Sequence, residues 1–236
     1  MINIVNNMKK IIQIIFLFCL STTNINGQTK KDTTFLLQEF LSDGAYHVVF
    51  VENNPNSNYY KMIQLPKIDF SEYKGNLKKI TDSFSVPIKK HLLYNIAKEW
   101  YPLKLYKNKY YLYIPSDPGI NPWVKINDSS INELYFDPGI VTSIIKNTER
   151  IDSNTIQLTV ANLTVGQVSF KVHVININKG LAIFERPYSS PEYKYTLMIE
   201  KSKIKNYPII VNYCNESRVD EWKFDNPDFL TLLRKK

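Results

Sequence analysis

The sequence has 236 residues, of which 30 are lysine or arginine and 22 are aspartate or glutamate, so the formal net charge is +8. The basic residues are scattered along the chain and only four of them are arginine, which argues against a nucleic-acid-binding surface. Seven glycines leave no glycine-rich phosphate loop, and the length is that of a single domain after removal of a leader.

The first 27 residues have the pattern of a secretory signal peptide. Two lysines precede the apolar run 11–20, and a polar stretch of small residues follows it. The run has about half of the roughly 20 residues that span a bilayer, so we expect cleavage before Gln28 and no transmembrane segment in the mature chain. Large residues precede Cys19 within the run, which argues against lipid anchoring there. The sequence therefore predicts export to the periplasm or beyond the cell.

The part from residue 28 to residue 102 is expected to be helical and mixed. The stretch 33–44 predicts a short helix, with a threonine cap at its start and a glycine at its end. The stretch 45–52 is rich in β-branched residues and predicts a strand. The stretch 85–100 predicts an amphipathic helix, because a proline stands near its start and apolar residues recur at a spacing of four. These residues are Ile88, Leu92, Ile96 and Trp100.

Short strands separated by turns are predicted from residue 103 to residue 214. Apolar and polar residues alternate clearly in several of them, which is typical of antiparallel sheets with one buried face. Asn178 to Gly180 give a hairpin signal. No helical pattern interrupts the region, so parallel crossovers are not expected. The predicted strands lie near 109–114, 124–127, 131–135, 141–150, 155–161, 168–177, 181–185, 195–200 and 209–213.

These elements predict a mainly β fold. The strands would form an antiparallel meander that closes into a barrel or remains a half-open sheet, with one or two N-terminal helices packed on it. Residues 28–236 would then be a single domain. Its tail, 215–236, is expected to contain a short last helix with Phe229, Leu232 and Leu233 against the body.

The stretch Tyr110 to Trp123, YYLYIPSDPGINPW, is unusually rich in aromatic residues. Its DPGI segment occurs again at 137–140, and both copies have the composition of a type II turn rather than of a calcium loop. Tyr111 and Tyr113 fall on one face of the predicted strand. These two tyrosines and Trp123 either belong to the core or form a stacking platform for a sugar or another flat ligand.

No catalytic motif is present in the sequence. There is no GxSxG elbow, the three histidines have no partners at metal-binding spacing, and Cys214 would be the one cysteine left after signal removal. We therefore predict no catalytic residue, no metal site and no cofactor. A pair of carboxylates or a cysteine and histidine pair could still be brought together by the fold.

Four segments resemble small exported proteins of the Bacteroidetes: WYPLKLYKNKYYLYIPSD, GLAIFE, YPIIVNYC and EWKFDNPDF. The meander after residue 103 also resembles a lipocalin-type barrel. The function expected from all of this is that of a non-catalytic exported binding or envelope-accessory protein. Its partner would be a small apolar or glycan ligand in a pocket at the open end of the sheet, or another envelope protein. The alternative is an extracytoplasmic hydrolase acting on glycans or peptides.

Overall fold

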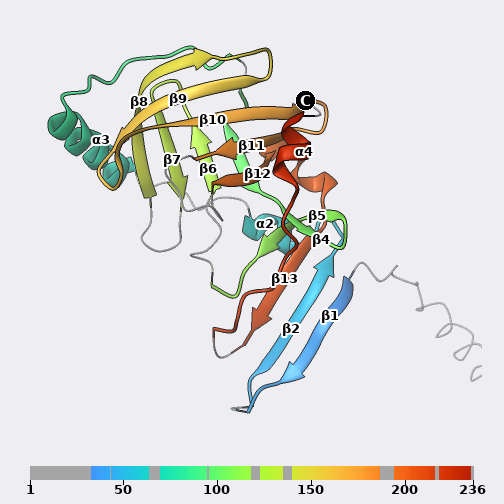
Figure 1. Ribbon diagram of the computed structural model, residues 1–236. Coiled ribbons are helices and arrows are strands. Elements are labelled where there is room, and N and C mark those ends of the chain that lie inside the picture. Colours follow the sequence, from blue (N-terminus) through green and yellow to red (C-terminus); the bar gives the residue numbers. More distant parts are fainter. Residues whose placement is uncertain are drawn as a thin grey trace, which may run out of the picture. The chain divides into compact units, whose positions relative to one another are not determined.

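The computed structural model describes residues 33–42, 44–63, 70–94, 96–117, 123–134, 140–186, 194–215 and 218–234, all of which belong to one compact unit. The predicted signal peptide, Cys19 and most of the two DPGI turns lie outside these residues. Within them the fold is mainly β, with two sheets and a few short helices, which confirms the predicted class (Figure 1). Of the described helices, none is both long and apolar enough to cross a membrane.

Eight antiparallel strands form a closed barrel. From β6 to β12 each strand pairs with the next one along the chain, and β3 closes the barrel between β12 and β6. The predicted meander is therefore confirmed. The strands are β3 (Glu99–Pro102), β6 (Trp123–Ile126), β7 (Ser130–Leu134), β8 (Ile140–Arg150), β9 (Thr155–Asn162), β10 (Gly166–Asn176), β11 (Leu181–Glu185) and β12 (Tyr195–Glu200).

Apolar side chains fill the interior of this barrel. One cluster of buried residues takes members from all eight strands, as only an interior can. Within it, Ile156 and Leu158 of β9 stand opposite Val172 and Phe170 of β10, as their alternation in the sequence predicts. Burial of each such side chain contributes roughly 1.5–3 kcal/mol to stability. The interior therefore acts as a packed core.

An ion pair joins two walls of the barrel. The Arg186 guanidinium, directly after β11, lies 2.8 Å from the Glu133 carboxylate of β7. In the strand order β7 and β11 are separated by β6, β3 and β12, so the pair crosses the barrel. The same guanidinium lies 5.6 Å from the centre of the Phe184 ring, a cation–π contact.

A second, five-stranded sheet has the order β1-β2-β13-β5-β4. One of its faces packs on the outer side of the barrel, where Phe50, Leu112 and Val211 share a buried cluster with Tyr101 and Ile183. The other face carries a separate cluster and is discussed below. The strands are β1 (Thr33–Phe40), β2 (Tyr46–Glu52), β4 (Lys104–Tyr106), β5 (Lys109–Ile114) and β13 (Ile209–Cys214).

Helix α3 covers part of the barrel. Its Leu77 and Ile80 are buried against Ile144 of β8 and Ala161 of β9 (Figure 1). The expectation of one or two N-terminal helices on the sheet is thus correct. The C-terminal helix is confirmed as well, since α4 packs its apolar residues on the main cluster. The helices are α2 (Asn58–Ile63), α3 (Phe70–Phe84), the 3-10 helix η2 (Lys201–Asn206) and α4 (Phe229–Arg234).

Neither of the two helices predicted in the N-terminal part is present at its predicted position. The stretch 33–44 was predicted as a helix, but residues 33–40 form β1, an edge strand paired with β2. Pairing with a neighbouring strand outweighs the modest helix propensity of this stretch. The helix predicted over 85–100 is also wrong, because 86–94 is irregular and Trp100 belongs to β3. The apolar residues at a spacing of four do not form one buried helical face, since Ile88 is 49% and Leu92 is 67% exposed.

The expectation of no parallel crossover is wrong for one pair of strands. β13 lies between β2 and β5 and runs parallel to β5, with Ile210 opposite Tyr113. The connection between these two strands is not a helix but the larger part of the barrel. The strands that were predicted lie within about two residues of their observed bounds, whereas β1, β3 and β4 were not predicted as strands. The hairpin at Asn178–Gly180 is confirmed by a turn in which Gly180 has a φ of +66°.

Candidate ligand-binding site

The three aromatic residues singled out in the sequence lie in two different places. Tyr111 and Tyr113 share one face of β5 and belong to the cluster on the open face of the five-stranded sheet. Trp123 lies in β6 within the cluster between the two sheets, where its ring packs 6.3 Å from Tyr101. The structure therefore brings Tyr111 and Tyr113 together but separates Trp123 from them.

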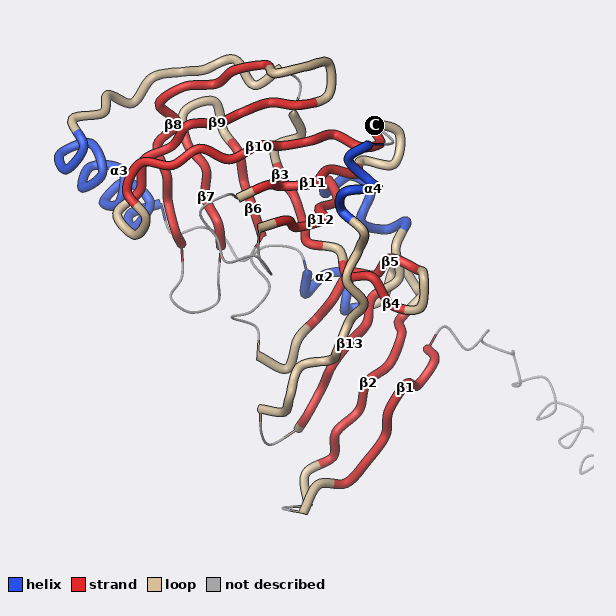
Figure 2. The backbone as a smooth tube through the Cα atoms, in the orientation of Figure 1, coloured by secondary structure: helices blue, strands red, loops and turns tan. Residues whose placement is uncertain are grey.

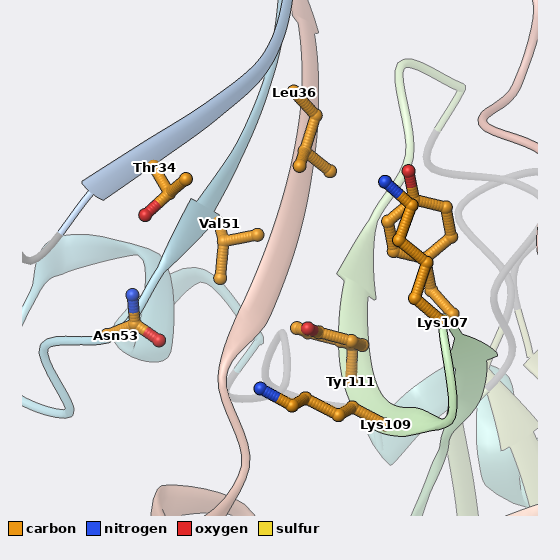
Figure 3. Close-up of a pocket in the computed structure, with 8 residues that line it drawn as sticks. Thr34, Leu36, Val51, Asn53, Lys107, Lys109 and Tyr111 are labelled. Carbon is orange, nitrogen blue, oxygen red and sulfur yellow. The ribbon is translucent and has the colours of Figure 1, made fainter.

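A pocket of about 410 Å³ opens on the sheet face beside Tyr111. This volume is in the range of roughly 300–1,000 Å³ that is typical of small-molecule sites. The edge hairpin β1–β2 forms one side and the hairpin β4–β5 the other (Figure 3). We call it the sheet pocket. The residues that line it are Thr34, Leu36, Val51, Asn53, Tyr106, Lys107, Lys109 and Tyr111.

Two tyrosine rings line the β4–β5 side of the sheet pocket. The Tyr106 and Tyr111 rings meet edge to face, with centroids 6.3 Å apart. Trp222 supports Tyr106 from another direction at 5.8 Å. Burial raises the pKa of Tyr111, so its hydroxyl stays protonated at neutral pH and can donate a hydrogen bond. Figure 3 shows this hydroxyl directed toward the β1–β2 side of the pocket.

Two lysines come from the tight turn between β4 and β5. Tyr106 pairs with Lys109, so only Lys107 and Asn108 form the loop. Both have positive φ, 48° and 62°, as a type I′ turn requires. This turn places Lys107 and Lys109 at the pocket, and the Lys107 ammonium lies 5.1 Å from the Tyr106 ring centre. In Figure 3 the Lys109 side chain extends from the β4–β5 side of the pocket toward the β1–β2 side.

A C-terminal strap, residues 218–225, covers the neighbouring part of the same sheet face (Figure 2). Phe224 packs its ring 4.8 Å from Tyr113, and the Asp225 carboxylate accepts a 2.8 Å hydrogen bond from the backbone amide of Lys107. The Tyr113 hydroxyl donates to the Glu221 carboxylate and accepts from Asn212 at 3.2 Å. Burial, followed by this contact with Glu221, raises the pKa of Tyr113. Tyr113 therefore fastens the strap, and it is not among the residues that line the pocket.

A row of polar side chains crosses the five-stranded sheet from β1 to the strap. The two ring nitrogens of His47 lie 2.8 Å from a Glu39 carboxylate oxygen and 2.8 Å from Asn212 Oδ1. The Asn212 amide nitrogen donates to the backbone oxygen of Asp220 at 3.1 Å, which fixes the orientation of the amide. Both groups facing His47 are therefore acceptors, and the ring must be doubly protonated to satisfy them.

The cysteine and histidine pair that the sequence left open does occur, but without catalytic geometry. Cys214 stands opposite His47 in the ladder between β13 and β2. Because both nitrogens of His47 are engaged by Glu39 and Asn212, neither is placed to take a proton from the thiol.

A second histidine contact lies on the outer side of the barrel. His173 of β10 lies 3.2 Å from the Thr155 hydroxyl and 3.0 Å from the Glu185 carboxylate. Burial raises the pKa of Glu185, but the hydrogen bond from His173 and nearby lysines outweigh it and lower the pKa overall. Thr155 is only 2% exposed, so this row of three side chains is closed to substrates and links three strands. Across the described part of the chain, no three His, Cys, Asp or Glu side chains gather in a way that could hold a metal ion.

Sequence reasoning found one of the eight lining residues, Tyr111. It missed the two lysines because β4 was not recognised as a strand, so KNK was not interpreted as a hairpin turn. The signal was present, since the apolar and aromatic runs on either side of Lys107 and Asn108 flank an asparagine suited to positive φ. The lining residues on the other side could not be predicted, because pairing between distant strands brings them to the pocket. They are Thr34, Leu36, Val51 and Asn53.

Comparison with protein-family models, with curated proteins and with solved structures finds no match. The resemblance to exported proteins of the Bacteroidetes therefore stays a prediction from the sequence, and the site must be interpreted from its own chemistry.

Proposed function

We propose that this protein is a non-catalytic exported binding protein that holds a small ligand with a flat ring, such as a sugar, in the sheet pocket. The observation that carries the proposal is a pocket of about 410 Å³ lined by the rings of Tyr106, which is half-buried, and Tyr111, which is 9% exposed. Aromatic rings offer a sugar a surface for stacking, while hydroxyl and amide groups bind its hydroxyls. Thr34 and Asn53 supply such groups on the opposite side.

The chemistry of the lining supports binding rather than catalysis. Its polar groups are a threonine, an asparagine, two tyrosines and two lysines, with no carboxylate, histidine or cysteine among the residues described at the pocket. Histidine is the most common general acid–base group at neutral pH, and catalysis by a lysine or a tyrosine requires a pKa tuned toward neutrality, whereas the pKa of Tyr111 is raised. The buried histidines His47 and His173 are tied into structural rows elsewhere.

The proposal can be tested with the mature protein purified from its own envelope fraction, whose intact mass also tests the predicted cleavage before Gln28. Native mass spectrometry of protein from its own envelope fraction would reveal a bound small molecule, and a saccharide array followed by calorimetry would measure affinity. Tyr111→Ala should weaken binding by between about fivefold and a hundredfold, because stacking is worth roughly 1–3 kcal/mol.

Tyr213→Ala is the matched control for this experiment. Tyr213 belongs to the same sheet but is 51% exposed and does not line the pocket. This variant should bind as the unaltered protein does. Equal affinities for Tyr111→Ala and Tyr213→Ala would show that the ligand, if one binds, lies elsewhere, and would overturn the proposal.

A further inference from the structure

The sheet pocket has a one-sided charge distribution. Two ammonium groups, those of Lys107 and Lys109, stand among its eight lining residues, and none of the eight carries a carboxylate. The Asp225 carboxylate, on the strap, accepts a hydrogen bond from the backbone amide of Lys107. The ammonium of Lys109 makes no hydrogen bond or ion pair with any described residue.

Five of the described lysines lie within 4 Å of a carboxylate, and Lys107 and Lys109 are not among them. Even the cross-barrel Arg186 has its own acidic partner. The two ammonium groups at the sheet pocket are therefore not neutralised by an ion pair with any described residue.

The turn that presents Lys107 is also unfavourable for lysine. A φ of 48° is disfavoured for side chains other than glycine, asparagine and aspartate. In a tight hairpin of this type, stability alone would favour asparagine or glycine at that position. The hairpin holds Lys107 in this strained conformation, and its side chain lines the pocket.

The proposed function, on which this inference rests, gives a ligand with a flat ring, such as a sugar. The two lysines narrow this class to ligands that also carry a negative charge. We infer that the sheet pocket binds an acidic saccharide, a sugar ring that carries a carboxylate or sulfate group. The ring lies against Tyr106 and Tyr111, and the anionic group pairs with Lys107 and Lys109. Hydroxyl groups on the sugar reach Thr34 across the pocket.

The test uses matched pairs of saccharides that differ only in charge. Oligogalacturonate is compared with its methyl ester, which keeps the backbone and removes the negative charge, and heparin oligosaccharides are compared with their desulfated forms. We expect at least one acidic member to bind, its neutral partner to bind at least tenfold more weakly, and the affinity to fall with added salt.

Lys109→Gln is the decisive variant, and Lys79→Gln is its control. Lys79 is an exposed lysine of α3 outside the pocket, so its loss removes one charge from the protein without touching the site. Lys109→Gln should weaken binding of the acidic saccharide by between about tenfold and a hundredfold, as for a charged hydrogen bond, and leave the neutral partner unaffected. Lys79→Gln should leave both affinities unchanged.

The possible results separate this inference from the proposed function. If acidic and neutral partners bind equally and Tyr111→Ala weakens both, the pocket is a sugar site but the inferred charge preference is wrong. If the two lysine variants lose affinity equally, the attraction belongs to the overall charge of the protein, and the inference is overturned. The inference is also overturned if neutral saccharides bind and acidic ones do not, or if no saccharide of either kind binds.

Discussion

The backbone amide of Trp222 donates a hydrogen bond of 3.0 Å to the hydroxyl of Tyr113. A side chain of β5 thereby holds the C-terminal strap on the face of the five-stranded sheet. Since Trp222 also contacts Tyr106, this attachment supports one wall of the sheet pocket.

Tyr113→Phe should destabilise the protein by about 1–3 kcal/mol, because the buried amide of Trp222 loses its acceptor and the Glu221 carboxylate loses a donor. The ring contact with Phe224 is retained, so the loss reports the hydroxyl alone. Urea unfolding followed by tryptophan fluorescence measures it. Tyr213→Phe, at an exposed position, is the control and should change stability little. Equal stability of the two variants would mean that the strap is not held by Tyr113.

The protonation of His47 predicts a dependence of stability on pH. Burial lowers the pKa of His47, but hydrogen bonds to Asn212 and Glu39 outweigh it, so the pKa is raised above its ordinary value of about 6.5. The folded protein then binds a proton more tightly than the unfolded chain. This contribution to stability is fully present below about pH 6.5 and is lost as the pH rises through the folded-state pKa.

The free energy of unfolding should therefore fall as the pH rises above about 6.5 in the unaltered protein, and should fall less in His47→Gln. His91→Gln is the comparison, since it removes a histidine from the irregular segment 86–94 and leaves the row across the sheet intact. Urea unfolding at a series of pH values gives the slopes. A slope for His47→Gln as steep as that of His91→Gln would contradict the assignment of the proton.

Two glycines should respond to alanine in opposite directions. Gly180 has a φ of +66°, and a Cβ there would lie 2.3 Å from the Glu200 Cγ, so Gly180→Ala should cost about 1–3 kcal/mol. Gly75 lies within α3, with nothing within 4 Å of an added Cβ, so Gly75→Ala should stabilise by about 0.5–1 kcal/mol. Thermal unfolding of both variants tests the backbone of the hairpin and of the helix. A loss of stability in Gly75→Ala, or no loss in Gly180→Ala, would contradict these two expectations.

The strands could be predicted from the sequence because their evidence is local. In β9 the alternation of Ile156, Leu158 and Val160 with polar residues is the same pattern that the folded barrel buries. The C-terminal helix was placed correctly, but the two N-terminal helices were not. Ile88 and Leu92 stand at helical spacing yet stay exposed, and residues 33–40 form β1 because they pair with β2. The pocket was less predictable still, since Leu36 and Tyr111 meet only through the order of strands in the sheet.

The turn between β4 and β5 links stability with binding. Lys107 at a φ of 48° is strained, whereas asparagine tolerates this conformation, so Lys107→Asn should stabilise the protein by up to about 1 kcal/mol. The same change removes an ammonium group from the sheet pocket and should weaken binding of an acidic saccharide.

Asn108→Gly separates these two effects. It relieves the neighbouring position, which has a φ of 62°, and the asparagine side chain is not part of the pocket lining. We expect this variant to gain stability, as glycine is preferred there, and to keep its affinity for the saccharide. Urea unfolding and calorimetry on the two variants give both quantities. If Lys107→Asn gained stability and kept full affinity, the strained lysine would have no role in binding, and its presence in the turn would need another explanation.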